Sequence, residues 1–472
     1  MRFIGRDHEL QRLQTRLESS RRTGQGEFIA MRGRRRVGKS RLVEEFAQRA
    51  GVPYVFYTAV QERPERELAR FLDAVAESDA PASGLVRAGA RADTWEAALD
   101  LATRDATAER PVIVVIDEFP YLVDREPAIE AVLQTVWDRT IQRRPVLLIL
   151  VGSDIATMAA LSEERRPLHD RPREMVVKPL TAYDIAAMLD LDAHGALDAY
   201  VVIGGFPVLA LEWGAGRSLE DYLAEALADP SSFLVLSAER ALAAEFPSAL
   251  RPRIVLNAIG GDVRANKEIL QRTQMNATTL TQALGTLVEK RIVDRLQPYS
   301  AKPSPGNKLY SVADPYMRFW LRYIGPNMPL IERGRGRLLA QRVAADFSTY
   351  RGRAIEPIIA SAIERLLPDD RFGAARHVGS FWTRTHAIEV DLVGGDKQPA
   401  ADDIGFVGSI KWRADATFTR ADAAALVAAR EAVPGAEATT RLIGVSRSGF
   451  DADVTVLDAQ LGPAEIIAAH GP

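Results

Sequence analysis

The chain has 472 residues, 47% hydrophobic and 26% charged, which excludes wholesale disorder and predicts roughly two to four globular domains. It contains no cysteine, so disulfide scaffolds, iron–sulfur clusters and cysteine nucleophiles are excluded, and its six histidines lack metal-ligand spacing. The net charge is −3, but residues 231–325 carry 13 Lys and Arg against 7 Asp and Glu. No apolar run is long enough to span a membrane and the first ten residues lack a signal-peptide core, so we expect a cytoplasmic protein.

The first third of the chain alternates short apolar runs with helical stretches. Strands are predicted at 27–33, 52–57, 111–116, 146–152 and 175–178, with helices at 40–49 and 64–77. The runs are β-branched and do not alternate with polar residues, as expected of strands buried on both faces. This order predicts an α/β core, residues 1–180, with a parallel sheet and crossover helices. Residues 181–246, rich in Ala and Leu, are predicted to form a helical lid.

Residues 247–325 show a different pattern, in which two helices precede two strands. The helices are predicted at 267–273 and 277–291, and the strands at 292–296 and 308–312. The loop between the strands is rich in Pro and Gly, a strong turn signal. Two helices, a tight turn and a two-stranded wing predict a winged helix-turn-helix. Such a module places its second helix in the DNA major groove and its wing on phosphates.

The basic charge of this segment favours DNA as a partner. The polar candidates on the second helix are Asn276, Thr278, Thr279, Thr281, Gln282 and Lys290, and those on the wing are Lys302 and Lys308. The excess charge is modest, however, and winged helices also serve as interdomain or protein-contact modules. A partner protein or a second copy of the chain therefore stays the alternative.

A phosphate-binding loop follows the first predicted strand. The segment GRRRVGKS at 33–40 fits the pattern G-x-x-x-x-G-K-[ST]. The glycines let backbone N–H groups wrap a triphosphate, Lys39 reaches the β and γ phosphates, and Ser40 ligates Mg²⁺. The helix that follows points its positive end at the anion. The sequence thus predicts an ATP and Mg²⁺ site with contacts from Gly33, Val37, Gly38, Lys39, Ser40 and Arg41.

The second half of the predicted site is an apolar strand that runs into Asp117 and Glu118. Asp117 would hold Mg²⁺ through water opposite the loop serine, and Glu118 would polarise the attacking water. Ser153, which ends the next strand, is equally well interpreted as a contact to the γ-phosphate or water and as part of a plain turn. Arg171 is a candidate arginine finger, with a solvated charge in an Arg-rich stretch as the alternative.

The ordered set of motifs resembles the archaeal-type ATPases of the AAA/STAND class of P-loop proteins. The motifs are FIGRDHEL at 3–10, GRRRVGKS at 33–40, VVIDEFPYL at 114–122, LVGSD at 150–154 and GGFP at 204–207. The resemblance implies that Ile4, Gly5 and Arg6 lie near the adenine. It also implies that Gly205 and Pro207 belong to an element by which the lid senses nucleotide.

The same family resemblance continues into the second half of the chain. The segment 308–320 looks like the end of its winged helix, and 350–356 like the start of its C-terminal domain of uncharacterised function. In residues 326–472 helices are predicted at 354–367 and 420–432, and strands at 387–393, 404–410 and 441–445. This order resembles the restriction-endonuclease-like α/β fold of PD-(D/E)xK nucleases.

The nuclease resemblance is incomplete at its metal site. In those enzymes an aspartate and a second acid hold Mg²⁺, and a lysine positions or activates water. Asp391 matches the aspartate and Lys411 the lysine, but Ser409 stands where the second acid belongs. A neutral hydroxyl is a poor ligand for a hard cation, and neither Glu356 nor Glu389 occupies the equivalent place. We therefore expect a nuclease-like fold retained for structure or nucleic-acid docking rather than for cleavage.

Together these patterns predict a Mg²⁺-dependent ATPase that works as a switch. ATP would close the P-loop domain against its lid, and hydrolysis would release the downstream modules. A DNA-directed ATPase and a signalling or scaffolding ATPase with a protein-contact winged helix are the two alternatives for its output. An ATP-regulated nuclease is a third and weaker one.

Overall fold

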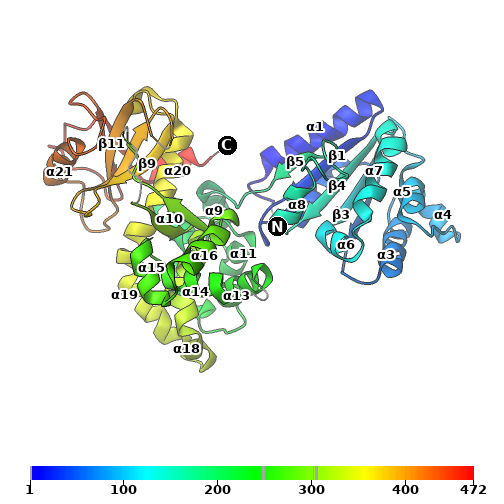
Figure 1. Cartoon of the computed structure of the whole chain (residues 1–472), viewed down its shortest axis with the longest axis horizontal. Helices are drawn as coiled ribbons and strands as arrows, with labels where there is room; N and C mark the ends of the chain where they lie inside the picture. Colours follow the sequence, from blue (N-terminus) through cyan, green and yellow to red (C-terminus); the bar gives the residue numbers. More distant parts are fainter. Residues whose placement is uncertain (1–2, 247–249, 301, 303–306, 399, 472) are drawn as a thin grey trace. The chain divides into compact units, whose positions relative to one another are not determined.

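The computed structural model describes residues 3–246, 250–300, 302, 307–398 and 400–471. Its contacts divide the chain into two compact units, Met1–Pro179 and Leu180–Pro472 (Figure 1). The predicted wing turn falls partly outside the described residues, at 301 and 303–306, and so does the predicted domain start at 247–249. Across the described residues, no helix is long and apolar enough to cross a membrane.

The first unit is built on a five-stranded parallel sheet, which confirms the predicted α/β core. Its strands are β1 (Glu27–Arg32), β2 (Tyr54–Thr58), β3 (Val112–Asp117), β4 (Val146–Gly152) and β5 (Arg173–Val176). Their order is β2-β3-β4-β1-β5, and every neighbouring pair runs parallel. Every residue of β3 and β4 is buried, which explains their unbroken apolar sequences. The C-terminal ends of β1, β3 and β4 therefore meet at one edge of the sheet.

Helices pack on both faces of this sheet. They are α1 (Asp7–Thr23), α2 (Lys39–Ala50), α3 (Pro64–Glu77), α4 (Ser83–Arg87), α5 (Trp95–Thr103), α6 (Phe119–Arg125), α7 (Ile129–Arg139) and α8 (Ile155–Ala160). Helices α1 and α2 cover one face, and α3, α5 and α7 cover the other (Figure 1). Pro64 starts α3, where its missing N–H costs nothing. Apolar residues then follow at helical spacing and are buried, among them Leu68, Phe71 and Val75.

The second unit opens with the five helices of the predicted lid. They are α9 (Ala182–Leu189), α10 (Ala193–Ile203), α11 (Pro207–Trp213), α12 (Leu219–Ala226) and α13 (Phe233–Glu245). Four begin at a residue whose side chain accepts a backbone N–H of the first turn: Thr181, Asp192, Ser218 and Ser232. One hydrophobic core runs from Leu180 in the lid to Ile467 near the C-terminus. The lid and the domains after it are thus packed as one body.

Helices and a small sheet follow the lid. The elements are α14 (Leu250–Ile259), β6 (Arg264–Ala265), α15 (Asn266–Thr273), α16 (Ala277–Glu289), β7 (Val293–Leu296) and β8 (Leu309–Val312). The three strands pair antiparallel in the order β6-β8-β7. The side chain of Asn276 caps α16, and Leu280, Leu284 and Leu287 bury its apolar face. The two-residue strand β6 was not predicted, because it is too short to show any periodicity.

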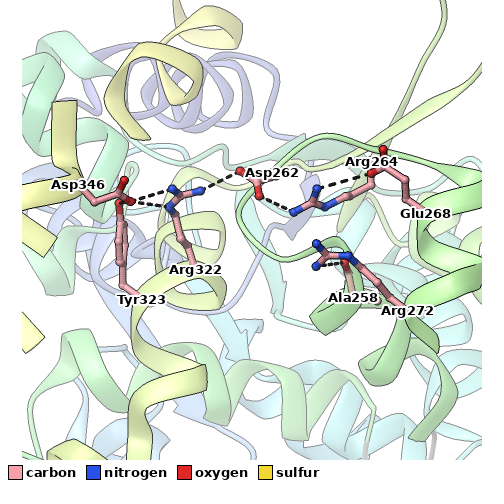
Figure 2. A network of polar contacts seen from close by, with 8 residues as sticks. All are labelled: Ala258, Asp262, Arg264, Glu268, Arg272, Arg322, Tyr323 and Asp346. Atoms are coloured by element: carbon pink, nitrogen blue, oxygen red, sulfur yellow. Dashed lines mark hydrogen bonds and ion pairs between the residues drawn. The ribbon is translucent and has the colours of Figure 1, made fainter. Parts of the chain in front are cut away.

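A helical linker leads to the C-terminal domain. It contains α17 (Pro315–Phe319), the π-helical turn η2 (Trp320–Ile324), the 3-10 turn η3 (Gly325–Asn327), α18 (Met328–Glu332) and α19 (Gly336–Ala354). Figure 2 shows how Arg322 of η2 connects two elements. Its Nη1 donates to Asp262 Oδ1 at 2.8 Å and its Nη2 to Asp346 Oδ2 at 2.7 Å. Arg264 donates to the other oxygen of Asp262 at 2.6 Å, so the network ties the turn before β6 to α19.

The C-terminal domain has a mixed five-stranded sheet. Its elements are α20 (Glu356–Leu366), η4 (Asp370–Phe372), β9 (His377–Trp382), β10 (Glu389–Gly395), β11 (Ile404–Lys411), α21 (Arg420–Arg430), β12 (Arg441–Ser446), β13 (Ala459–Leu461) and α22 (Pro463–Ala469). In the order β13-β12-β11-β10-β9, the pairs on β10 are antiparallel and the others are parallel. The helix predicted from 354 starts at Glu356, because Pro357 in its first turn has no N–H to extend the preceding helix.

Candidate functional site

Two glycines shape the loop between β1 and α2. A Cβ atom on Gly33 would lie 2.4 Å from the carbonyl oxygen of Val177, closer than any real contact allows. Gly38 has a φ of 89°, in the left-handed region that glycine adopts without strain, and it caps the start of α2. The loop backbone therefore takes a conformation that side chains at these two positions would prevent.

Lys39 points back into this loop from the first turn of α2. Its Nζ donates to the carbonyl oxygens of Gly33 at 2.9 Å and Arg34 at 3.1 Å, and to Ser153 Oγ at 3.1 Å. The side chain is only 5% exposed, and burial lowers the pKa of Lys39 to about 8 despite the opposing charge of Glu118. A buried cation held by neutral oxygens is poised for a strong interaction with an anion in the loop.

Asp117 and Glu118 leave β3 beside this lysine. Asp117 is buried and accepts hydrogen bonds from the Ser40 side chain and from the backbone N–H of Glu118. Burial raises the pKa of the Asp117 carboxyl, and its hydrogen bond with Ser40 opposes that shift. Glu118 has a φ of 51°, a left-handed conformation that is strained for a residue other than glycine. The structure thus brings the predicted Mg²⁺ ligands Ser40 and Asp117 together.

Ser153 joins the two charged groups of the site. Its hydroxyl donates to Glu118 Oε1 at 2.9 Å and accepts from Lys39 Nζ. The residue directly follows β4, which lies between β1 and β3 in the sheet. Of the two interpretations that the sequence allowed, the geometry favours a Ser153 that faces the phosphate site.

The N-terminal segment lies against the same loop. Arg6 is 5% exposed and its Nη2 donates to the carbonyl oxygen of Val37 at 2.8 Å. Gly5, next to it, has a φ of 76°, which glycine tolerates best. The segment that holds Ile4, Gly5 and Arg6 is therefore fixed beside the loop, consistent with the place that the family resemblance implies. Arg41, in contrast, points outward and pairs with acids of its own helix.

One further contact of the loop was not predicted from the sequence. Arg35 Nη2 donates to the hydroxyl of Tyr121 at 2.6 Å. Tyr121 lies in α6, the helix that begins directly after Glu118. Because the two partners are 86 residues apart, no local pattern in the sequence signals their contact.

The expectation for Arg171 needs a correction. Its guanidinium makes two bonds to Asp138, at 2.9 and 2.8 Å, and donates to the carbonyls of Pro167 and His169. These residues lie beside Glu27 at the start of β1, whereas the phosphate loop follows the end of that strand, about 20 Å away. Arg171 therefore does not serve the P-loop of its own chain, and only a role at the nucleotide of a second copy stays a prediction.

Pro207 belongs to the second unit, where it starts α11 directly after the predicted G-x-P element. Leu180 donates its N–H to the carbonyl of Gly205 at 2.9 Å, so this element is fixed to the first residue of the unit. Its role in sensing nucleotide stays a prediction.

The residues around the loop fit ATP and Mg²⁺. Gly33 lets the loop pass close to the backbone of Val177, and Lys39 supplies the buried charge. Ser40 and Asp117 offer one hydroxyl and one carboxylate, a donor set that suits Mg²⁺ when substrate phosphates and water complete its shell. Bound Mg²⁺ would neutralise phosphate charge as the γ-phosphate is transferred to water.

The nuclease-like residues form a second polar cluster, in the C-terminal domain. Asp391 Oδ2 accepts from Ser409 Oγ at 3.1 Å and from the N–H of Ile410 at 2.7 Å. Burial raises the pKa of Asp391. Burial also raises the pKa of Glu356, and with the negative charge of Asp391 beside it this pKa reaches about 8. Lys411 lies 4.0 Å from Asp422. Among the described residues, no group of three or more Asp, Glu or His is placed to hold a metal ion.

Comparison with known families supports the reading of the first unit. Residues 3–207 match the model of an ATPase domain found predominantly in Archaea. Residues 320–425 match a family of archaeal and bacterial proteins of unknown function. The protein therefore carries a P-loop ATPase domain, followed by a C-terminal domain of the second family, and is an ATPase.

Individual relatives add little about the role of the protein. An uncharacterized protein of Methanocaldococcus jannaschii is 24% identical over 415 residues, which cover 87% of this chain and 88% of the relative. The Walker-type ATPase of Pyrococcus abyssi is similar over 68% of this chain and 96% of its own, with 17% identity and a TM-score of 0.47. The ORC2 protein of Aeropyrum pernix, solved with ADPNP and ADP, covers 72% and 95% at 16% identity and a TM-score of 0.45. Values this low support no inference about ligands or partners.

Proposed function

We propose that the protein is a Mg²⁺-dependent ATPase switch that acts on DNA through the segment 247–325. The observation that carries the ATPase part is the continuous set of contacts from Lys39 through Ser153 to Glu118, beside the bonded pair Ser40 and Asp117. These contacts support a site in which a cation, two Mg²⁺ ligands and a general base surround one loop.

Each residue then has a distinct task. Lys39 binds the β and γ phosphates, and the pKa of its amine rises again when they approach. Ser40 holds Mg²⁺ directly and Asp117 holds it through water. Glu118 orients and polarises the attacking water, and its hydrogen bond from Ser153 keeps the carboxylate aimed at the site. Ser153 therefore acts as a positioning residue between base and phosphate.

The lid supplies the route from the nucleotide to the downstream domains. Asp198 of α10 accepts from Arg351 of α19 at 2.8 Å and from Arg447, which follows β12, at 2.9 and 3.1 Å. All three side chains are nearly buried, so breaking this triad would leave unpaired buried charge. The release of the modules from the lid, which the sequence suggested, is therefore disfavoured. We propose instead that they move together with the lid.

The middle of the second unit supports a winged-helix interpretation. Helices α15 and α16 join through a short turn and are followed by strands β7 and β8. Thr278, Thr281 and Gln282 are exposed on one side of α16, opposite its buried leucines. Lys302 and Lys308 are exposed on the segment between the strands. Lys290, in contrast, is held by Glu245 at 3.1 Å and is less available to DNA.

DNA-dependent ATP turnover tests this function. The full chain is titrated with a 30-base-pair duplex at rising salt, because phosphate contacts make log Kd linear in log salt. The double variant Lys302→Glu and Lys308→Glu should weaken binding about equally for all sequences and lower the salt slope by about two. Lys397→Glu, an exposed lysine on the loop between β10 and β11, serves as the control. A wild type that binds no DNA at low salt, with or without ATP, would leave the protein-contact alternative in its place.

A further inference from the structure

A hollow lined by arginines opens beside the start of α3, in the ATPase domain. Its volume is about 960 Å³. The charged residues in its wall are Arg63, Arg66, Arg70, Arg125, Glu62 and Asp73. It follows β2, whose neighbour β3 carries Asp117, so it lies along the same edge of the sheet as the phosphate loop.

The positive charge of this hollow is not balanced by its acids. Arg70 is committed to Glu62, with bonds of 2.9 and 3.3 Å. Among the described residues, Arg63, Arg66 and Arg125 make no ion pair, and all three are exposed. Arg63 caps the 14-residue helix α3 and Arg66 lies in its first turn, where the helix dipole adds positive potential. The hollow is therefore suited to an anion.

The wall of the hollow is joined to the catalytic base by one short helix. Helix α6 begins directly after Glu118 and ends at Arg125, which faces the hollow. Gln61 Nε2 donates to Asp124 Oδ2 at 2.8 Å and so ties the loop before α3 to the same helix. Gln61 has a φ of 65°, a strained conformation that its surroundings must hold.

The same helix also touches the phosphate loop, through the bond between Tyr121 and Arg35. An anion that draws in Arg125 would therefore act on the C-terminal end of α6. The N-terminal end of this helix follows Glu118, and its Tyr121 contacts the phosphate loop. This gives the hollow a physical path to the hydrolysis step.

We propose that this hollow binds the phosphates of a DNA strand and that α6 passes the binding on to the ATPase site. The proposal rests on the proposed function and adds to it a second DNA contact, in the ATPase domain. Guanidinium groups pair with phosphate oxygens in a bidentate manner. From Arg63, which precedes α3, to Arg70 the helix rises by seven steps, about 10 Å, which is longer than a single phosphate group. Seven of the nine residues that line the hollow are polar or charged, whereas small-ligand pockets are lined mostly by apolar side chains.

The test compares two double variants of the full chain that lose the same charge. Arg63→Gln with Arg66→Gln removes two groups of the hollow, and Arg21→Gln with Arg22→Gln removes two exposed arginines at the end of α1. Both should hydrolyse ATP at the wild-type rate without DNA. The hollow variant should need at least about tenfold more duplex to change the turnover rate, and its salt slope should fall by nearly two. The control should respond as the wild type does.

A second variant and a second polyanion keep the test decisive. Arg125→Gln should weaken the effect of DNA on turnover more than it weakens DNA binding, because Arg125 lies on the path to Glu118. The proposal would be overturned if the hollow variant responded to DNA as the wild type does while the wing variant lost DNA binding. That result would leave the proposed function standing. Absence of DNA binding by the wild type would overturn both. A response to polyglutamate as large as that to DNA, lost in the hollow variant, would replace DNA with an acidic protein.

Discussion

Two polar sites in this molecule each lie on a five-stranded sheet, yet their charges are arranged in opposite ways. At the phosphate loop, the buried cation Lys39 lies within reach of Asp117 and Glu118, with Ser153 between cation and base. In the C-terminal domain, the carboxyls of Asp391 and Glu356 are half-buried, the negative charge of Asp391 raises the pKa of Glu356, and Ser409 adds no charge. At the phosphate loop every charged residue of the motif is present, whereas the C-terminal cluster has Ser409 in place of the second acid of the nuclease motif. A sequence motif predicts an activity only where every charged residue that the reaction needs is present.

The largest effect is expected from breaking the complete site. Lys39→Ala should weaken ATP binding by about 100-fold or more, because the phosphates lose the buried cation that faces them. Glu118→Gln should keep ATP bound and slow hydrolysis by a factor of about 10²–10⁴, because only water activation is lost. Equilibrium binding of a fluorescent ATP analogue and single-turnover hydrolysis separate the two outcomes.

The exposed Lys178, which follows β5, provides the matched control. Lys178→Ala should leave both measurements unchanged. Hydrolysis by Glu118→Gln at the wild-type rate would show that the role given to Glu118 is wrong and that the site is not organised around this base.

The same contrast explains how much of the fold and of the site could be predicted from the sequence. The ATPase core follows from local signals: apolar runs fix β3 and β4, and the glycines and Lys39 of the loop are adjacent in the chain. The contacts between Arg6 and Val37 and between Arg35 and Tyr121 join positions 31 and 86 residues apart. Such pairs have no periodicity, so only the folded chain reveals them.

The position of Arg171 was hidden for a related reason. Arg171 precedes a strand near the end of the core, but sequence order does not say at which end of a strand a loop residue lies. Its bidentate pair with Asp138 depends on α7 packing beside β1. Likewise β13, which has three residues, is too short to stand out as a strand before its neighbours are known.

The incomplete site can be sharpened by pH. Burial and the nearby Asp391 raise the pKa of Glu356 to about 8, whereas the unfolded chain titrates near 4.5. Below pH 4.5 Glu356 is protonated in both the folded and the unfolded state, so its ionisation does not change the free energy of unfolding. Between pH 4.5 and 8 only the unfolded state releases the proton, so stability falls as pH rises. Glu356→Gln removes this cost, about 5 kcal/mol at most.

Calorimetry of the full chain measures that difference. The unfolding midpoint of Glu356→Gln should equal that of wild type at pH 4.5 and exceed it at pH 8.5 by several degrees, since each kcal/mol shifts a midpoint by roughly 2–4 °C. Glu364→Gln, an exposed position on the same helix, should show no such dependence. An equal gain at both pH values would mean that Glu356 acts through packing rather than through its charge.

The smallest effect is expected at Asp391 itself, as measured by DNA cleavage. Cleavage by PD-(D/E)xK nucleases needs Mg²⁺ to polarise the scissile phosphate and the attacking water, and the ion takes one or two carboxylates from the protein. Here Asp391 Oδ2 is already bonded to Ser409 Oγ and to the N–H of Ile410, and the described residues offer no group of three acids or histidines to hold a metal. Wild type should therefore not nick supercoiled plasmid, with Mg²⁺ or with Mn²⁺.

Asp391→Ala should then behave as wild type does, which is the result expected of a residue that keeps only a structural bond. Ser409→Glu offers the positive control, because it places a second carboxylate beside Asp391 and leaves Lys411 two residues further along β11. Nicking that appears in Ser409→Glu would show that one charge separates this domain from activity. Nicking by wild type that disappears in Asp391→Ala would instead show that Glu356 or Glu389 supplies the missing ligand, and that the second site is as complete as the first.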